Sequence, residues 1–325
     1  MLPLRPLTYF APPNLDELFR CLDSRGQHIK LMAGGTDLLP NLKHGLYDIA
    51  SVVSLRKLSE LKNIAINGNR LELGALVKLN DVAHHPVIKQ MVPALSKASA
   101  HIASPQIRNM GTLGGNICLD TRCLYFNQTE FWRRALGYCL KKDGDCCHVV
   151  KTGKRCVAAA SNDLATVLLS LNASVSVAST PATREMPLDD FYTTNGQKNN
   201  ILFPYEVVTT IKVPSAANAG FYKLRHRHSV DFPLLSVAAA LELDGQKILR
   251  SGRVVINALV AKPKVMDLAD FHGVTYNRSV VEEIARLAES KSFPQTNISD
   301  DPGWRKDMVA YAVKQALDDA IKVAD

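Results

Sequence analysis

The alternation of apolar and polar positions in residues 1–55 predicts a small α/β unit. Three short apolar runs are typical of strands: 7–10, 28–33 and 49–55. The polar segment between the first two carries apolar residues at helical spacing: Leu15, Leu18, Phe19 and Leu22. Asn14 can cap this helix, and residues 38–42 begin a further helix or turn.

Residues 56–215 predict a second, larger α/β unit. Its predicted strands are a hairpin over 64–73 with a turn at Asn67-Gly68, a half-exposed alternating strand over 173–177, and a strand over 205–213. Its predicted helices are a short one capped by Asn80 and Asp81, one over 87–101, and one over 164–171. Residues 119–160 interrupt the unit as a long insert, which we expect to fold outward.

Residues 216–325 predict an antiparallel sheet backed by helices. Strands are expected over 220–226, 234–243 and 248–259, the last two joined by an Asp244-Gly245 turn. Residues 279–290 and 304–323 have the spacing of amphipathic helices. The chain therefore divides into predicted domains 1–55, 56–215 and 216–325.

Composition is that of an ordinary soluble protein. Apolar residues make up 46% of the 325 positions and charged residues 22%. No apolar run approaches the roughly 20 residues that span a bilayer, and no secretory signal pattern is seen. We therefore expect a cytoplasmic protein without a membrane partner.

Cysteines are concentrated in one stretch. Six of the seven lie between Cys118 and Cys156, which in a reducing compartment points to metal or redox chemistry. Cys21 and Cys118 have apolar neighbours and fit small buried hydrophobes. Cys146 and Cys147 lie among charged residues and do not fit that interpretation.

Positive charge is also concentrated in the insert. The chain carries a net charge of +8, and residues 121–156 hold eight lysines and arginines against three acids, a surplus of five. A basic patch attracts nucleic acid, acidic lipid or an acidic protein. No nucleic-acid motif accompanies it, so nucleic acid is the weaker choice, and a merely solvated surface is a serious competitor.

Two glycine loops carry a family resemblance. The segments 29–38 (IKLMAGGTDL) and 107–116 (IRNMGTLGGN) resemble the two flavin-binding loops of the FAD subunits of the xanthine dehydrogenase and carbon monoxide dehydrogenase family. Residues 160–164, the strand ending at Pro214 and the segment 221–223 also resemble that family. Glycines let a backbone approach a pyrophosphate without a Cβ clash.

The resemblance implies an α+β protein that binds FAD. It implies two N-terminal α/β subdomains of the PCMH/VAO-type FAD-binding fold, then a C-terminal antiparallel sheet with helices. The pyrophosphate would lie on Ile29, Lys30, Leu31, Met32, Ala33, Gly34, Gly35 and Thr36. The ribityl chain or flavin ring would lie on Gly111, Thr112, Leu113, Gly114, Gly115, Asp163, Val208 and Lys223. His101 is a candidate for lining the cleft, and a capping or packing role fits it equally.

The insert resembles one branch of the family, the β subunits of 4-hydroxybenzoyl-CoA reductases, whose inserted loop binds a [4Fe-4S] cluster. The resemblance implies four ligands: Cys123, Cys139, Cys147 and Cys156. Spacing alone favours an iron–sulfur cluster and structural zinc equally, and the neighbouring flavin favours the cluster. Cys146 is the alternative to Cys147. The insert's aromatic residues would shield the cluster or form a small core of their own.

No catalytic residues are expected on this chain. It has no Ser/His/Asp triad, phosphate-binding P-loop or HExxH motif, and the run Arg225–His228 would alternate faces on a strand and could not converge on a metal. The resemblance implies an electron-transfer subunit. Its partners would be ferredoxin as donor, a [2Fe-2S] small subunit and a molybdopterin large subunit, assembled as a dimer of heterotrimers. The alternatives are a xanthine- or aldehyde-type FAD subunit that reduces NAD, and a non-enzymatic zinc-stapled scaffold.

Overall fold

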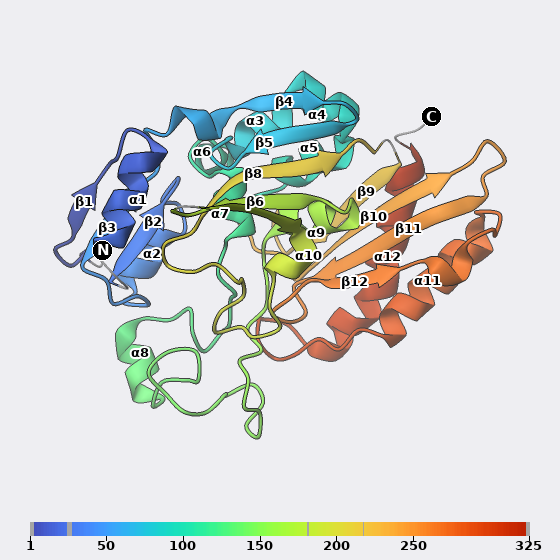
Figure 1. The fold of residues 1–325 in the computed structure, drawn as a ribbon. Coiled ribbons are helices and arrows are strands. Elements are labelled where there is room, and N and C mark those ends of the chain that lie inside the picture. The colour runs from blue at the N-terminus through green and yellow to red at the C-terminus, as the bar shows by residue number, and fades with distance from the viewer. Residues whose placement is uncertain (1–2, 25–27, 181, 217, 323–325) are drawn as a thin grey trace.

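Three β-sheets organise the chain, and the computed structural model describes residues 3–24, 28–180, 182–216 and 218–322 (Figure 1). The first sheet is parallel, in the order β1-β3-β2, with β1 Thr8–Phe10, β2 Ile29–Met32 and β3 Ser51–Ser54. Its helices are α1 Leu15–Asp23 and α2 Leu38–Lys43. The predicted cap is confirmed, because the Asn14 side chain accepts a hydrogen bond from the Glu17 amide.

The second sheet is antiparallel, in the order β4-β5-β8-β6-β7. Its strands are β4 Ile64–Asn67, β5 Arg70–Gly74, β6 Ser174–Ala178, β7 Thr183–Pro187 and β8 Val207–Pro214. The helices of this part are α3 Leu79–His84, α4 Pro86–Met91, α5 Pro93–Ala100, α6 Pro105–Arg108, α7 Leu113–Ile117, α8 Glu130–Ala135, α9 Asp163–Ser170 and α10 Leu188–Phe191, with a 3-10 turn at Ser59–Lys62.

Several local predictions for this unit are wrong. The helix expected over 87–101 is two helices, because Val92 leaves helical geometry and Pro93 starts α5. Asn80 and Asp81 lie inside α3 rather than capping it. The strand expected to be half-exposed, β6, is almost wholly buried because it lies between β8 and β7. The hairpin loop is Gly68-Asn69, since Asn67 still pairs with Arg70.

The third sheet is antiparallel, in the order β12-β11-β10-β9. Its strands are β9 Ala219–Leu224, β10 Leu235–Leu243, β11 Leu249–Asn257 and β12 Lys264–Asp267, followed by a 3-10 turn at Ala269–Phe271. The helices α11 Arg278–Ser290 and α12 Pro302–Lys322 pack together, and α12 packs on β9 and β10 (Figure 1). The predicted end of this last helix, Val323, lies outside the described residues.

Helix α9 joins the second and third units. It contacts α5 and α7 on one side and strands β10 and β11 on the other. The apolar core of the second sheet accordingly includes Phe221, Ala238 and Val255 from the third. This packing places the N-terminus of α9, at Asp163, against the third sheet.

The insert protrudes from the body of the molecule as a lobe, as expected, and it also packs on the segment that follows α2 (Figure 1). Apart from α8 it is irregular, and it lies below α2 in Figure 1. Leu46, which follows α2, packs with Phe126 and Cys139 of the insert. Arg133 of α8 donates to the carbonyl oxygens of His44 and Gly45, at 3.1 and 2.9 Å. Within the described ranges, no helix combines the length and apolarity needed to cross a bilayer.

Candidate functional site

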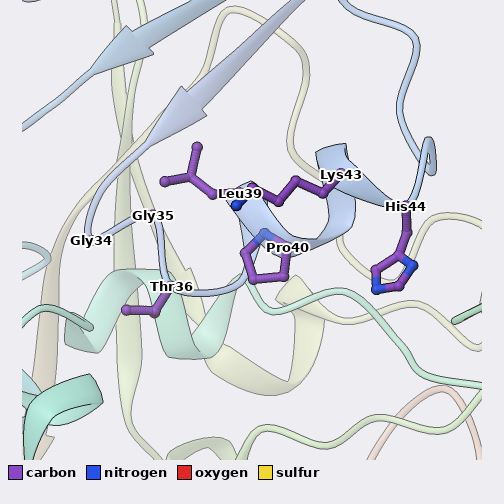
Figure 2. A pocket seen from close by; sticks show the side chains of 7 residues that line it. All are labelled: Gly34, Gly35, Thr36, Leu39, Pro40, Lys43 and His44. Atoms are coloured by element: carbon purple, nitrogen blue, oxygen red, sulfur yellow. The ribbon is translucent and has the colours of Figure 1, made fainter. Parts of the chain in front are cut away.

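The first glycine loop opens onto a cavity. It connects β2 to α2, and its Gly35 has a φ of +74°, a backbone conformation that side chains rarely adopt. A cavity of about 460 Å³ lies beside it (Figure 2). The lining residues are Gly34, Gly35, Thr36, Leu39, Pro40, Lys43 and His44. This loop therefore offers backbone, a hydroxyl and a lysine to a ligand.

The two glycine loops, far apart in sequence, are packed against each other. A Cβ on Gly34 would lie 2.1 Å from the Met110 carbonyl oxygen and 3.0 Å from the Gly111 Cα. Gly115 approaches the first loop from the other side, with Ala33 Cβ 3.8 Å from its ideal Cβ position. Thr112 caps α7 by accepting a hydrogen bond from the Gly115 amide at 3.1 Å. The structure thus brings residues 33–36 and 111–115 into one wall.

Asp163 and Lys223 form a buried ion pair beyond this wall. Lys223 Nζ lies 2.6 Å from Asp163 Oδ2, and both side chains are at most 3% exposed. Lys223 also donates to the carbonyl oxygens of His101 and Asp231. Burial raises the pKa of Asp163, and the nearby Lys223 opposes that rise. Asp163 Oδ1 is buried and has no hydrogen-bond partner among the described residues.

His101 lies beside the ion pair as the C-cap of α5. Its Nδ1 is 2.8 Å from the Lys97 carbonyl oxygen, and its ring meets Phe221 edge-on. Its carbonyl oxygen accepts from both Lys223 and Arg225. Burial lowers the pKa of His101, and nearby cations lower it further. His101 therefore caps α5 and packs against Phe221, beside the Asp163–Lys223 ion pair.

Three predicted FAD residues have their side chains in the protein core. Ile29 belongs to the core of the first unit, and Leu113 and Val208 belong to that of the second. Each is at most 7% exposed. Only the backbone of these residues is available to a ligand. The remaining strand residues of the predicted set are Lys30, Leu31 and Met32, which are less buried.

Four cysteines of the insert line one small cavity. They are Cys123, Cys139, Cys147 and Cys156, and the cavity between them is about 20 Å³. Cys139, Cys147 and Cys156 are at most 8% exposed, whereas Cys146 is exposed and does not line the cavity. Burial raises the pKa of Cys123 to about 11, and the three other thiols add to the rise. Within the described residues, no three His, Cys, Asp or Glu side chains converge as a single metal ion requires.

The aromatic residues of the insert divide between two roles. Phe126 is buried and lines the cavity with Tyr125, which packs against His148 at 5.1 Å between ring centroids. Phe131 is 75% exposed and Trp132 is 37% exposed. The first pair forms the small core of the insert, and the second pair lies on the surface of α8.

Two of the eight basic residues counted over 121–156, which their charge would lead us to expect on the surface, are buried. The side chains of Arg133 and Lys141 are 1% and 3% exposed. Lys141 bonds Asp120 and the Gly196 carbonyl oxygen, both at 2.7 Å. No local pattern distinguishes them from their exposed neighbours, because their partners come from distant parts of the chain.

The run Arg225–His228 lies after β9 rather than on a strand. Arg225 donates to the His101 carbonyl oxygen at 3.0 Å. His226 Nε2 lies 2.9 Å from Asp300 Oδ1. Arg225 also lies 3.5 Å from His228 Nδ1, and His226 has a different partner, so the four side chains do not converge on one point.

Comparisons with known proteins bear on the same regions. Residues 5–216 match a family described as the FAD binding domain in molybdopterin dehydrogenase. The chain is 32% identical over 252 residues to the aldehyde oxidoreductase FAD-binding subunit PaoB of Escherichia coli, covering 74% of this chain and 78% of that one. It is 24% identical to the carbon monoxide dehydrogenase medium chain of Hydrogenophaga pseudoflava, over 98% of both chains.

Solved structures confirm the predicted fold class. The carbon monoxide dehydrogenase structure from Hydrogenophaga pseudoflava superposes with a TM-score of 0.80 at 22% identity, covering 99% of both chains. Quinoline 2-oxidoreductase from Pseudomonas putida 86 superposes with a TM-score of 0.79 at 22% identity, covering 99% of this chain and 100% of that one.

Proposed function

The chain belongs to the family of FAD-binding medium subunits of molybdenum hydroxylases, the carbon monoxide and xanthine dehydrogenase type, and on that premise we propose that it is the electron-transfer subunit of a 4-hydroxybenzoyl-CoA reductase. Bound FAD and a [4Fe-4S] cluster would carry electrons from reduced ferredoxin toward a [2Fe-2S] subunit and a molybdopterin subunit, for reductive dehydroxylation to benzoyl-CoA. The observation that carries the proposal is that four cysteines line one small cavity inside an insert that lies beside the flavin loops.

The residues around the glycine loops fit FAD. Gly34 leaves no room for a side chain because the second loop touches it, and the cavity beside it is open to a pyrophosphate. Lys43, at the end of α2, lines that cavity and can contribute positive charge. Asp163 Oδ1 is a buried acceptor without a partner, which a hydrogen-bond donor of the flavin would satisfy.

The four cysteines fit a cubane cluster better than zinc. A tetrahedral zinc site, with Zn–S bonds of about 2.3 Å, needs its four sulfurs about 3.8 Å from one another. A cubane takes one thiolate at each iron, so its cysteines surround a larger body. The side chains line a common cavity without converging on one point, in the part of the chain that the structure describes.

The chain's own residues hold the two sites in proximity. Arg122, next to the ligand Cys123, pairs with Asp37 at 2.9 Å, directly after the first glycine loop. Tyr47 donates to Asp120 at 3.0 Å, which joins the segment after α2 to the start of the insert. These contacts fix the distance across which electrons would pass, and the buried apolar residues around Cys139 exclude water.

One preparation tests the proposal. Protein purified without oxygen should contain FAD, about four irons and as many acid-labile sulfides per chain. Replacing Cys123, Cys139, Cys147 and Cys156 together by serine should remove iron and sulfide, with the fold retained by circular dichroism. Zinc without sulfide would contradict the cluster and favour the zinc-stapled scaffold. Protein without flavin affinity would contradict the FAD site.

An aldehyde-oxidising subunit is the second candidate, and the 32% identity to PaoB favours it. Coexpression with a [2Fe-2S] subunit and a molybdopterin subunit separates the two. Reduced ferredoxin should support dehydroxylation of 4-hydroxybenzoyl-CoA by the complex in the first case. Turnover of aromatic aldehydes with NAD or another acceptor, and none of the thioester, would establish the second.

A further inference from the structure

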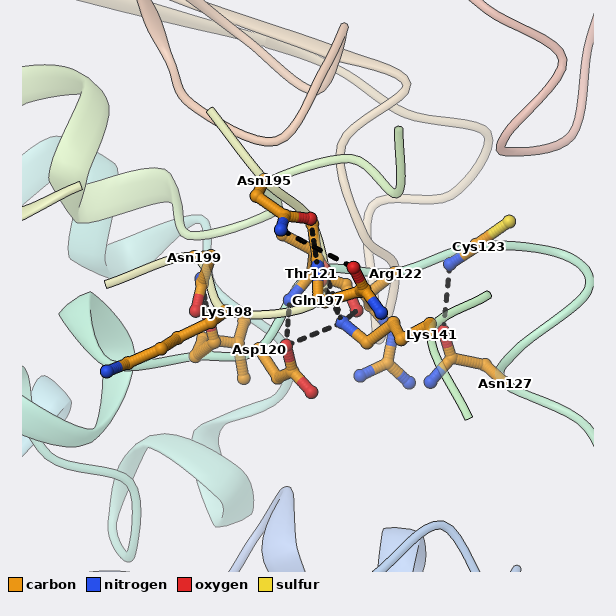
Figure 3. A network of polar contacts seen from close by, with 12 residues as sticks. Asp120, Thr121, Arg122, Cys123, Asn127, Lys141, Asn195, Gln197, Lys198 and Asn199 are labelled. Carbon is orange, nitrogen blue, oxygen red and sulfur yellow. Dashed lines mark hydrogen bonds and ion pairs between the residues drawn. The ribbon is translucent and has the colours of Figure 1, made fainter. Parts of the chain in front are cut away.

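A buried lysine lies in the wall of the four-cysteine cavity. Lys141 is 3% exposed at its side chain and lines the cavity together with the four thiols. Its ammonium lies 4.7 Å from the centre of the Phe126 ring. Figure 3 shows it pointing into a polar cluster with Asp120 and Thr121. Among the described lining residues it is the one lysine or arginine.

Lys141 is held in place by groups from two segments that are far apart along the chain. It bonds Asp120 Oδ1 at 2.7 Å and the Thr121 carbonyl oxygen at 3.2 Å. The Gly196 carbonyl oxygen, from a loop far along the chain, accepts at 2.7 Å. That loop has no room for a side chain at Gly196, where a Cβ would lie 2.9 Å from Cys156 Sγ. The ammonium is therefore fixed, and cannot swing into solvent as a surface lysine does.

Asp120 partly compensates this charge. It is the one carboxylate bonded to Lys141 in the described residues, and its side chain is 25% exposed. Its other oxygen accepts from Tyr47. A fixed cation beside an anionic cluster stabilises the reduced state, which carries one more negative charge, and a nearby carboxylate does the reverse.

We propose that the positive charge of Lys141 raises the reduction potential of the group bound by the four cysteines. The negative charge of Asp120 opposes this effect. The inference rests on the proposed function, because it requires a redox group in the cavity. Neither residue is a ligand. The pair sets how readily the insert accepts an electron from a donor.

Two variants that change the local charge in opposite directions test this proposal. The variants are Lys141→Met and Asp120→Asn, with Lys142→Met as the matched control, since Lys142 pairs with Asp143 outside the cavity. Each is purified without oxygen and titrated by electron paramagnetic resonance, with iron, sulfide and flavin content measured alongside. We expect a lower midpoint potential in Lys141→Met, a higher one in Asp120→Asn, and no shift in Lys142→Met.

Shifts of the same sign in both variants, or no shift in either, would overturn the inference, because a purely structural effect has no reason to follow charge. If Lys141→Met fails to retain its cluster, Asp120→Asn decides alone, and an unchanged or lower potential there would overturn it. Wild-type protein without iron and sulfide would instead refute the proposed cluster itself.

Discussion

At the scale of single residues, two adjacent cysteines have opposite environments. Cys147 is 7% exposed and lines the four-cysteine cavity, whereas Cys146 is exposed. The family resemblance selects Cys147, but no local sequence pattern separates the two. The difference follows from the packing of the insert, which turns one side chain inward and leaves its neighbour in solvent.

Cys147→Ser should therefore lower the iron content from about four atoms per chain to three or fewer, because a cubane that loses a thiolate is unstable or loses an iron. Cys146→Ser should retain full iron and sulfide. Iron and sulfide analysis of the two variants, purified side by side, measures this. Equal loss in both, or loss only in Cys146→Ser, would assign the ligand differently.

The glycine at the contact of the two loops allows a second test. Gly34→Ala places a methyl group 2.1 Å from the Met110 carbonyl oxygen, so the loops must separate, at a cost of about 1–3 kcal/mol. We expect a lower unfolding temperature and reduced flavin content. Gly245→Ala is the control, because nothing lies within 4 Å of its Cβ position and its φ is not positive. A Gly34→Ala protein with normal flavin content would show that the loop contact does not shape the cofactor site.

At the scale of elements, Arg133 links helix α8 to the first unit. Arg133 donates to Gln128, His44 and Gly45 carbonyl oxygens and pairs with Glu130. Arg133→Met leaves these oxygens without their donor and should weaken the attachment by about 1–3 kcal/mol. Hydrogen exchange across residues 124–138 should accelerate. Arg134→Met, on the exposed face of the same helix, should leave exchange unchanged, and equal acceleration in both would contradict the anchoring role.

Elements with strong local patterns could be predicted from the sequence, and elements determined by packing could not. The Asn14-capped helix and the C-terminal helices follow their apolar periodicity. Strand β7 was not anticipated, because its exposed residues carry no apolar alternation and it is defined by pairing with β6. The same applies to β6, whose alternation of serine and valine suggests a half-exposed strand although both faces are covered.

The candidate site shows the same division. The glycine loops and the four cysteines could be selected from motifs, and the structure brings each set together. The burial of Lys141 and Arg133 could not, because their partners lie up to 89 positions away along the chain. The surplus of positive charge counted over residues 121–156 therefore overestimates how much of that charge lies on the surface of the insert. The packing of the insert on the first unit depends on these same long-range contacts.

At the scale of the whole molecule, the insert presents a mixed surface beside the four-cysteine cavity. Exposed cations remain at Arg134, Lys151, Lys154 and Arg155 after the buried ones are excluded. Phe131 and Leu136, on and just after α8, are 75% and 43% exposed. Exposed cations and exposed apolar residues on the same insert suit an acidic electron carrier, whose approach is accelerated by opposite charge.

Charge reversal at those four exposed cations should slow reduction of the complex by ferredoxin, on the order of tenfold at low salt, and flatten its dependence on ionic strength. The matched control reverses four exposed cations elsewhere: Lys62, Lys89, Lys247 and Arg286. Stopped-flow measurement of flavin reduction between low and high salt compares the two variants. The four exposed cations act on the approach of ferredoxin rather than on the redox groups, so the midpoint potentials should match those of the wild type. Equal rates in both variants at every salt concentration would mean that the donor docks elsewhere on the complex.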